Sequence, residues 1–201
     1  MEKYFSCDVE ADGPIPGPYS MSSFALVACA VRTNDGQIYD LDIDDAENCF
    51  YVELKPISNQ FIPEAAAISG LDRDELILSG QDPAVAMTAA LEWIEKRAGA
   101  TTLGGPFRPV FAAYPVTYDW MWFYWYIMNF AGRSPFGHSS AVDMKSYFAA
   151  RADKEIRNVG KRAMPAELKS KRTHTHHSLD DAREQGELLR NMMRWRRPSD
   201  D

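Results

Sequence analysis

The alternation of apolar and polar positions divides the chain into an initial run of strands and a later part in which helices and strands alternate. Short runs rich in Ala, Val, Leu and aromatic residues predict strands at 4–9, 23–32, 37–43, 49–54, 110–114 and 141–143. The turn Asn34-Asp35-Gly36 joins the second and third of these. Three consecutive strands with short connections predict an antiparallel meander.

Helical spacing of apolar residues begins after the meander. The clearest helix starts at Asp82-Pro83, a capping residue followed by proline at the first helical position, and it ends at Gly99. The full set of helices is predicted at 63–69, 83–98, 119–130, 144–151 and 178–193. The segment 154–173 has weak periodicity, so we expect a mobile basic loop there. The fold class is α/β, with a mixed sheet of an antiparallel meander followed by parallel strands, flanked by helices.

Length and composition favour one compact protein. With 201 residues and 45% hydrophobic content, we expect a single domain over 1–197 and a short tail at 198–201. The three cysteines, Cys7, Cys29 and Cys49, lie in apolar segments without a C-x-x-C pair, which predicts reduced thiols in the cytoplasm. No secretory signal is apparent, and the most hydrophobic stretch, 120–132, is shorter than the roughly 20 residues of a membrane span. We therefore expect a soluble, cytoplasmic protein without a membrane partner.

Charge is distributed unevenly along the chain. The net charge of −7 argues against a nucleic-acid partner, yet 35–53 holds seven acids and no Lys or Arg, whereas 151–172 holds eight bases and three acids. A solvated surface is the ordinary interpretation of such a basic run. Next to a histidine cluster, it predicts instead a path for a phosphate backbone. The bases expected to contact nucleic acid are Lys161, Arg162, Lys169, Lys171 and Arg172.

Four carboxylates interrupt apolar patterns at the ends of predicted elements. They are Asp8, Glu10, Asp119 and Asp181. Asp8 and Glu10 project from one face of a strand, at the kind of strand end where ligands bind. Asp119 lies among aromatic residues, where an unpaired carboxylate would cost several kcal/mol, so it needs a cation; the alternative is that it caps the following helix. Oxygen ligands of this kind select Mg²⁺ or Mn²⁺.

Two such ions, held about 3.5–4 Å apart, support phosphodiester hydrolysis by activating water and stabilising the leaving oxygen. This chemistry also needs a base. The loop before the last predicted helix offers His176 and His177, five and four residues ahead of Asp181, and histidine titrates near neutrality. The alternative for the histidines at 174–177 is a surface cluster without a role.

Together these motifs resemble the DEDDh family of 3′→5′ exonucleases, a branch of the ribonuclease H-like fold, over nearly the whole chain. Asp8-Val9-Glu10 is similar to the first family motif, Tyr118-Asp119 to the second, and the H-x-x-x-x-D from His176 to Asp181 to the third. The segment 62–71, IPEAAAISGL, is similar to one that the family carries between its first two motifs. Four motifs in the family's order make the resemblance specific.

The resemblance implies a metal-dependent 3′→5′ exonuclease that hydrolyses single-stranded RNA or DNA from the 3′ end and releases 5′-nucleoside monophosphates. It implies that the four carboxylates hold two Mg²⁺ or Mn²⁺ ions and that His176 is the general base. His177 competes for this role, because a related branch places a tyrosine four residues before the last aspartate. RNA and DNA both remain open.

The chain also departs from the family pattern. Pro14 follows Gly13 where the family often has a leucine that wedges against the terminal base, and Tyr114-Pro115 replaces the usual H-N before the second motif. Base stacking is therefore expected from other residues. The candidates in the first loop are Ile15, Tyr19 and Met21, and those near the second motif are Trp120, Trp122 and Phe123, for which burial in the core is the alternative.

Two other functions stay open at this point. One is a catalytically silent nucleic-acid-binding module that keeps the fold; the other is a phosphodiesterase acting on very short oligonucleotides. The sequence does not give the oligomeric state, although several members of the family are homodimers. Docking of the arginine-rich end, 194–197, on a larger assembly is a further alternative.

Overall fold

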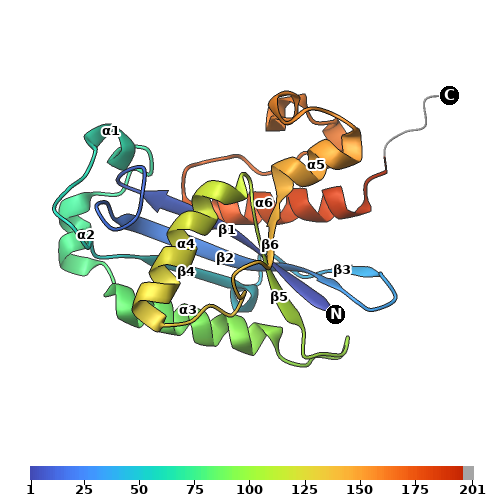
Figure 1. Ribbon diagram of the computed structural model, residues 1–201, viewed down its shortest axis with the longest axis horizontal. Helices are drawn as coiled ribbons and strands as arrows, with labels where there is room; N and C mark the ends of the chain where they lie inside the picture. Colours follow the sequence, from blue (N-terminus) through green and yellow to red (C-terminus); the bar gives the residue numbers. More distant parts are fainter. Residues whose placement is uncertain (197–201) are drawn as a thin grey trace.

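A six-stranded mixed sheet forms the centre of the computed structural model, which describes residues 1–196 (Figure 1). The strand order is β3-β2-β1-β5-β6, and β4 also pairs with β2. β2 is antiparallel to β1, β3 and β4, whereas β5 is parallel to β1 and to β6. The strands are β1 (Glu2–Ala11), β2 (Met21–Arg32), β3 (Ile38–Asp40), β4 (Cys49–Glu53), β5 (Arg108–Ala113) and β6 (Ala141–Asp143). The predicted fold class is confirmed, and the predicted tail lies outside the described residues.

Six α-helices in the described part of the chain surround this sheet. They are α1 (Pro63–Ala66), α2 (Arg73–Ser79), α3 (Pro83–Ala98), α4 (Val116–Ala131), α5 (Met144–Ala152) and α6 (Ser178–Arg194). The sequence pattern missed α2, because it buries only Leu76 and so has no apolar stripe. Within residues 1–196, no helix combines the length and apolar character needed to cross a membrane.

α4 begins three residues earlier than predicted, and this changes the interpretation of Asp119. Pro115 occupies the N-cap position, and Asp119 lies inside the first helical turn. The alternative in which Asp119 caps this helix is therefore wrong. Its carboxylate is therefore not used to cap the helix and lies near the positive end of the helix dipole, which attracts negative charge.

The basic segment between α5 and α6 is more regular than the sequence indicates. It contains three short 3₁₀ helices, η2 (Ile156–Asn158), η3 (Lys161–Ala163) and η4 (Ala166–Leu168). Val159, Met164 and Leu168 are 0%, 4% and 1% exposed and anchor the segment to the core that includes α5 and α6. Three isolated apolar anchors give no helical periodicity, so the sequence pattern could not reveal them.

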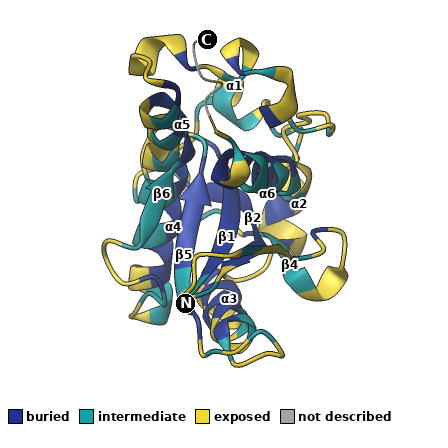
Figure 2. Ribbon diagram, turned by 90° about the vertical axis from the view of Figure 1, so that its right-hand side faces the viewer, coloured by how far each residue is buried: buried dark blue, intermediate teal, exposed yellow. Residues whose placement is uncertain are grey.

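Alternation along β1 determines which side chains face which helices. Phe5, Cys7 and Val9 belong to the core beneath α3 and α4, whereas Tyr4 belongs to the opposite core beneath α5 and α6. β1 and β2 are buried along most of their length between these layers (Figure 2). Because side chains alternate between faces, Ser6, Asp8 and Glu10 share the α6 face with Tyr4.

Helix α6 approaches β1 very closely, through small residues. The Ser6 hydroxyl donates a 2.7 Å hydrogen bond to the Ala182 carbonyl of α6. A Cβ on Gly186 would lie 2.9 Å from Ser6 Oγ and 3.0 Å from Cys29 Cβ. Only glycine fits at this position, and the close approach brings the first turns of α6 over the end of β1.

Two acids of the acidic stretch, Asp40 and Asp44, form ion pairs with arginines. Arg194 of α6 forms a 2.7 Å ion pair with Asp40, and Arg172 forms one of 2.6 Å with Asp44. Arg183 and Arg190 donate hydrogen bonds of 3.0 Å each to backbone carbonyls at Ile43 and Leu41. The ion pair of Asp40 with Arg194 and these two backbone contacts therefore hold α6 against the edge of the sheet.

Replacing Gly186 with alanine tests the close approach. We expect Gly186→Ala to lower the free energy of unfolding by about 1–3 kcal/mol, because the added methyl must displace β1 or β2. Gly160→Ala is the matched control, since a Cβ there meets nothing within 4 Å. Urea unfolding of both variants provides the measurement, and equal stabilities would contradict the packing argument.

Candidate active site

Three of the four predicted carboxylates form one cluster. Asp8 and Glu10 at the end of β1 and Asp181 in the first turn of α6 each offer an oxygen, and these oxygens lie within 4.8 Å of one another. The residues are 9%, 9% and 0% exposed. Residues 170 positions apart in sequence thus meet because α6 packs over the end of β1.

Asp119 completes the group from the opposite direction. Its Oδ1 accepts a 2.9 Å hydrogen bond from the backbone N–H of Val9, which lies between Asp8 and Glu10. Asp8, Glu10, Asp119 and His176 line a common cleft of about 500 Å³, together with Tyr118. The structure therefore brings the second-motif aspartate to the cleft that the first-motif carboxylates line.

Burial makes ionisation of these carboxylates unfavourable. It raises the pKa of Glu10 to about 7, with a smaller effect from the charge of Asp181, and raises the pKa of Asp119 to about 8. Burial, together with repulsion from Asp119, Glu10 and Asp181, raises the pKa of Asp8 well above its ordinary range. A compact set of hard oxygen donors that repel one another fits a divalent cation, which would remove both penalties.

Gln185 fixes the orientation of Asp8 and was missed in the sequence analysis. Its Nε2 donates a 2.7 Å hydrogen bond to Asp8 Oδ1, while its Oε1 accepts one of 2.8 Å from the backbone N–H of Tyr114. Gln185 lies one helical turn after Asp181, on the buried face of α6. That position was the available signal, because a polar residue on a buried helix face requires partners.

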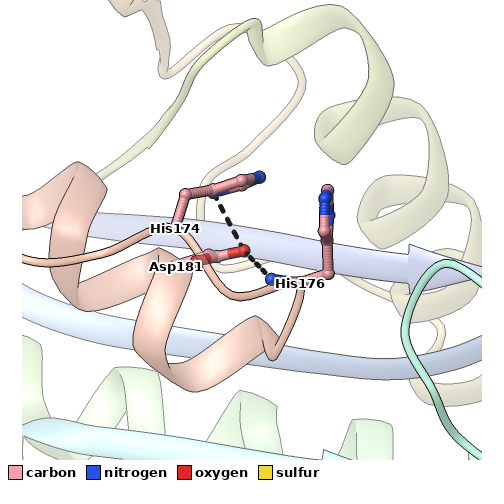
Figure 3. A group of neighbouring side chains, drawn as sticks. All are labelled: His174, His176 and Asp181. Carbon is pink, nitrogen blue, oxygen red and sulfur yellow. Dashed lines mark hydrogen bonds and ion pairs between the residues drawn. The ribbon is translucent and has the colours of Figure 1, made fainter.

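Asp181 is held by the loop that precedes it. The backbone N–H groups of Thr175 and His176 donate 2.9 Å hydrogen bonds to its two carboxylate oxygens. The Nδ1 atom of His174 lies 3.0 Å from Oδ2 of Asp181 (Figure 3). His176 has a φ of 59°, a left-handed conformation that is strained for a non-glycine residue. The sequence analysis gave no individual role to His174.

The two candidate bases lie in different environments. His176 lines the cleft with Asp8, Glu10 and Asp119. His177 stacks on Tyr51 of β4, with ring centroids 4.8 Å apart, and its Nδ1 lies 3.9 Å from Asp180. Of the pair, it is therefore His176 that the loop conformation presents to the carboxylates.

Three of the predicted base-stacking residues require correction. Met21, Trp122 and Phe123 are each 0% exposed and belong to the core beneath α3 and α4. A side chain without exposed surface cannot stack on a base, so the core alternative holds for them. Trp120 is partly buried against the same core, with its ring stacked on Tyr124.

The first loop presents the other candidates at the surface. Ile15 is 47% exposed, whereas Tyr19 is half-buried against Gly13. The loop is anchored by an ion pair between Arg73 and the 1% exposed Asp12, whose Oδ1 also accepts a 2.6 Å hydrogen bond from the N–H of Ser20. Asp12 and Arg73 therefore determine where Ile15 lies relative to Glu10, and the sequence analysis assigned no role to either.

The predicted basic contacts divide into two groups. Lys161 pairs with Glu184 of α6, and Arg172 pairs with Asp44, so these two cations already have protein partners. Arg162, Lys169 and Lys171 are exposed, and Lys169 donates to the Arg162 carbonyl at 3.2 Å. Lys161 is the cation of this set whose charge lowers the pKa values of Asp8 and Asp119, against the larger effect of burial.

Solved nuclease structures share this fold. The nuclease domain of 3′hExo, described as a DEDDh family member bound to rAMP, has a TM-score of 0.66 at 12% identity, covering 96% of this chain and 90% of that one. E. coli exonuclease I in complex with a dT13 oligonucleotide has a TM-score of 0.64 at 13% identity, covering 98% of this chain and 42% of that one. These similarities define a ribonuclease H-like exonuclease fold.

A curated relative identifies the family. The 3′-5′ DNA exonuclease Cap18 of Escherichia coli is 33% identical over 189 residues, which cover 94% of this chain and 90% of the relative. No protein-family model matches the chain. The chain belongs to the DEDDh family of 3′→5′ exonucleases and is an enzyme of this kind.

The raised pKa values predict how pH and a divalent ion together affect stability. Unfolded carboxylates titrate near about 4, whereas Glu10 and Asp119 titrate at about 7 and about 8 in the folded protein. The folded state therefore binds more protons, and without a divalent ion its stability falls as pH rises from about 4 to about 8. Mg²⁺ binds the ionised carboxylates, so its stabilising effect grows over the same range.

We expect the increase in melting temperature on adding Mg²⁺ to be larger near pH 8.5 than near pH 5.5, because proton competition is weaker at the higher pH. Calorimetry with EDTA or Mg²⁺ at both pH values measures this difference. Asp119→Asn is expected to reduce the pH dependence. An equal shift at both pH values would contradict the assignment of the carboxylates as ion ligands.

Proposed function

We propose that this exonuclease removes nucleotides one at a time from the 3′ end of single-stranded DNA and releases 5′-deoxynucleoside monophosphates. The observation that carries the proposal is that Asp8, Glu10 and Asp119 line one cleft with His176, while an oxygen of Asp181 lies within 4.8 Å of oxygens of Asp8 and Glu10. The choice of DNA is supported by the described activity of the relative Cap18. A cleft of about 500 Å³ lies within the usual range for a small-molecule site and suits a terminal nucleotide.

In this proposal Asp8, Glu10, Asp119 and Asp181 hold two Mg²⁺ or Mn²⁺ ions. When bound, the ions lower the pKa of water and stabilise charge on the leaving oxygen. Gln185 keeps Asp8 in position, and the backbone N–H groups of residues 175 and 176 keep Asp181 in position. A rigid ligand set of this kind lowers the cost of organising the site in each turnover.

His176 is the proposed general base. Its side chain enters the cleft, and its backbone N–H is bonded to Asp181, so a ligand and the base are held by the same turn. The imidazole accepts a proton from the attacking water, whose oxygen bonds to phosphorus as the bond from phosphorus to the 3′ oxygen of the preceding nucleotide breaks. That 3′ oxygen takes a proton from solvent and leaves as a hydroxyl group. The proton gained by His176 then passes to solvent.

Contacts to the nucleic acid are proposed on two sides of the cleft. Ile15 and Tyr19, in the loop anchored by Asp12 and Arg73, pack against the terminal base. The exposed basic side chains of Arg162, Lys169 and Lys171, together with Lys161, attract the phosphate backbone. Arg172 contributes if phosphate replaces the acidic side chains with which it is paired. Contact of Trp120 with nucleic acid stays a prediction. The homodimer, the larger assembly and the cytoplasmic location also stay predictions.

Substitution of Asp8 tests the metal site. We expect Asp8→Asn to reduce hydrolysis by about a thousandfold or more, since an ion ligand contributes several kcal/mol to the transition state. Without a divalent ion, the same variant should melt at a higher temperature than the wild type, because one of the repelling charges is removed. Release of labelled mononucleotides and thermal unfolding measure the two effects. Wild-type turnover by Asp8→Asn would contradict the site assignment.

Substitution of the two neighbouring histidines tests the base. We expect His176→Ala to lower kcat by about 10²–10⁴-fold, the usual contribution of a general base. His177→Ala is the matched control and should retain kcat, because its ring stacks on Tyr51. Single-turnover rates at saturating Mg²⁺ separate the two variants, and the opposite ranking would assign the base to His177.

Substrate class is tested with matched DNA and RNA strands labelled at the 5′ end. The proposal predicts stepwise shortening from the 3′ end, faster on single-stranded DNA than on RNA or duplex, and complete loss of shortening with EDTA. Faster digestion of RNA would overturn the choice of DNA. Binding without shortening would instead support a silent module, and activity restricted to dinucleotides would support a phosphodiesterase for short oligonucleotides.

A further inference from the structure

Asp181 belongs to two donor sets that differ in their other members. The first consists of oxygens from Asp8, Glu10 and Asp181; the second consists of the imidazoles of His174 and His176 and the same Asp181 carboxylate. In the second set, one ligand atom from each residue also lies within 4.8 Å of the others. Figure 3 shows both rings on the same side of Asp181. The proposed exonuclease chemistry uses His176 but leaves His174 without a role.

The second set is compact enough to close around a tetrahedral metal ion. Zinc binds nitrogen at about 2.0–2.1 Å and carboxylate oxygen at about 2.0–2.2 Å, so two of its ligands lie about 3–3.5 Å apart. His174 Nδ1 and Asp181 Oδ2 are 3.0 Å apart, and the His174 and His176 rings have centroids 4.5 Å apart at 72°. The His174 side chain is 46% exposed, so its ring has room to close the remaining distance.

The backbone of the loop supports this arrangement. Thr175 and His176 direct their N–H groups at Asp181, and His176 adopts a left-handed φ of 59° to do so. Such a conformation costs about 1–3 kcal/mol for a non-glycine residue and marks sites where the surrounding structure fixes the geometry. The result is a turn wrapped around one buried carboxylate, with the imidazoles at positions 174 and 176 on its outer side.

We propose that His174, His176 and Asp181 form a binding site for Zn²⁺, distinct in its ligands from the all-oxygen set that suits Mg²⁺ or Mn²⁺. Imidazole nitrogen is a borderline-soft donor that selects Zn²⁺ over Mg²⁺. Three protein ligands leave a fourth position open towards the solvent or a phosphate oxygen. Glu184, whose Oε2 lies 4.0 Å from His174 Nδ1 and pairs with Lys161, is a further carboxylate beside this set.

Occupancy of this site has a consequence for catalysis, which rests on the proposed function. The nitrogen lone pair that His176 would donate to zinc is then unavailable for a proton from water. Zn²⁺ therefore acts as an inhibitor of an enzyme that Mg²⁺ activates. Because Asp181 is shared between the two sets, Mg²⁺ and Zn²⁺ compete for this carboxylate, and excess Mg²⁺ weakens the inhibition.

Direct metal binding provides the first test. The full chain is stripped of metal, saturated with Mg²⁺ and titrated with Zn²⁺ by calorimetry, or with Co²⁺ by its visible absorption. We expect one ion per chain with a tetrahedral Co²⁺ spectrum. His174→Ala and His176→Ala should each weaken Zn²⁺ binding by more than about tenfold. Loss of an outer-shell partner alone costs at least about tenfold in metal affinity, and loss of a direct ligand should cost more.

The other two histidines of the chain are matched controls. His177→Ala and His138→Ala should bind Zn²⁺ as the wild type does, because His177 stacks on Tyr51 and neither residue belongs to the donor set. Circular dichroism of every variant confirms folding. The proposal is overturned if His174→Ala binds as tightly as the wild type, if His177→Ala loses as much affinity, or if the wild type binds no Zn²⁺ with Mg²⁺ present.

Inhibition provides the second test and separates the two proposals. Relative to its own rate in Mg²⁺, His174→Ala should need more than about tenfold more Zn²⁺ for half-inhibition than the wild type does. If the chain hydrolyses no DNA but Zn²⁺ binding still requires His174, the proposed function fails and the zinc site stands. If hydrolysis is intact and binding is independent of His174, the zinc site alone fails.

Discussion

Repulsion between buried carboxylates is the constraint on which the rest of the structure depends. Asp8, Glu10, Asp119 and Asp181 are all at most 9% exposed and close enough to raise one another's pKa values or those of their neighbours. A folded chain tolerates such a group only if other interactions hold it together. The tight contact of α6 with β1 through Ser6, Ala182 and Gly186 supplies that interaction, and it does so next to the carboxylates.

Three of the four carboxylates are oriented by groups that carry no net charge. Gln185 holds Asp8, the N–H of Val9 holds Asp119, and two successive N–H groups hold Asp181. Neutral donors fix geometry without neutralising the site, so the attraction for a divalent ion is retained. Lys161, the cation that acts on Asp8 and Asp119, is paired with Glu184 and so weakens this attraction little.

The sequence was sufficient for the strands and helices that have strong periodicity and for the family, but less so for the surroundings of the site. The four carboxylates could be named because each interrupts an apolar pattern. Gln185, Asp12 and Arg73 could not, since their roles arise from partners 61 to 177 positions away in the chain. Trp122 and Phe123 were named for their aromatic character, which does not distinguish a stacking surface from a core without knowledge of the helix face.

The sheet ends in short strands on both sides. β3 and β6 have three residues each, β4 has five, and arginines of α6 bond to Asp40 and to the backbone carbonyls that follow β3. Short, charged edges offer little to an incoming strand, which protects the protein from edge-to-edge aggregation. Such edges direct contacts between copies towards helices and loops and leave the mixed sheet a unit within each copy.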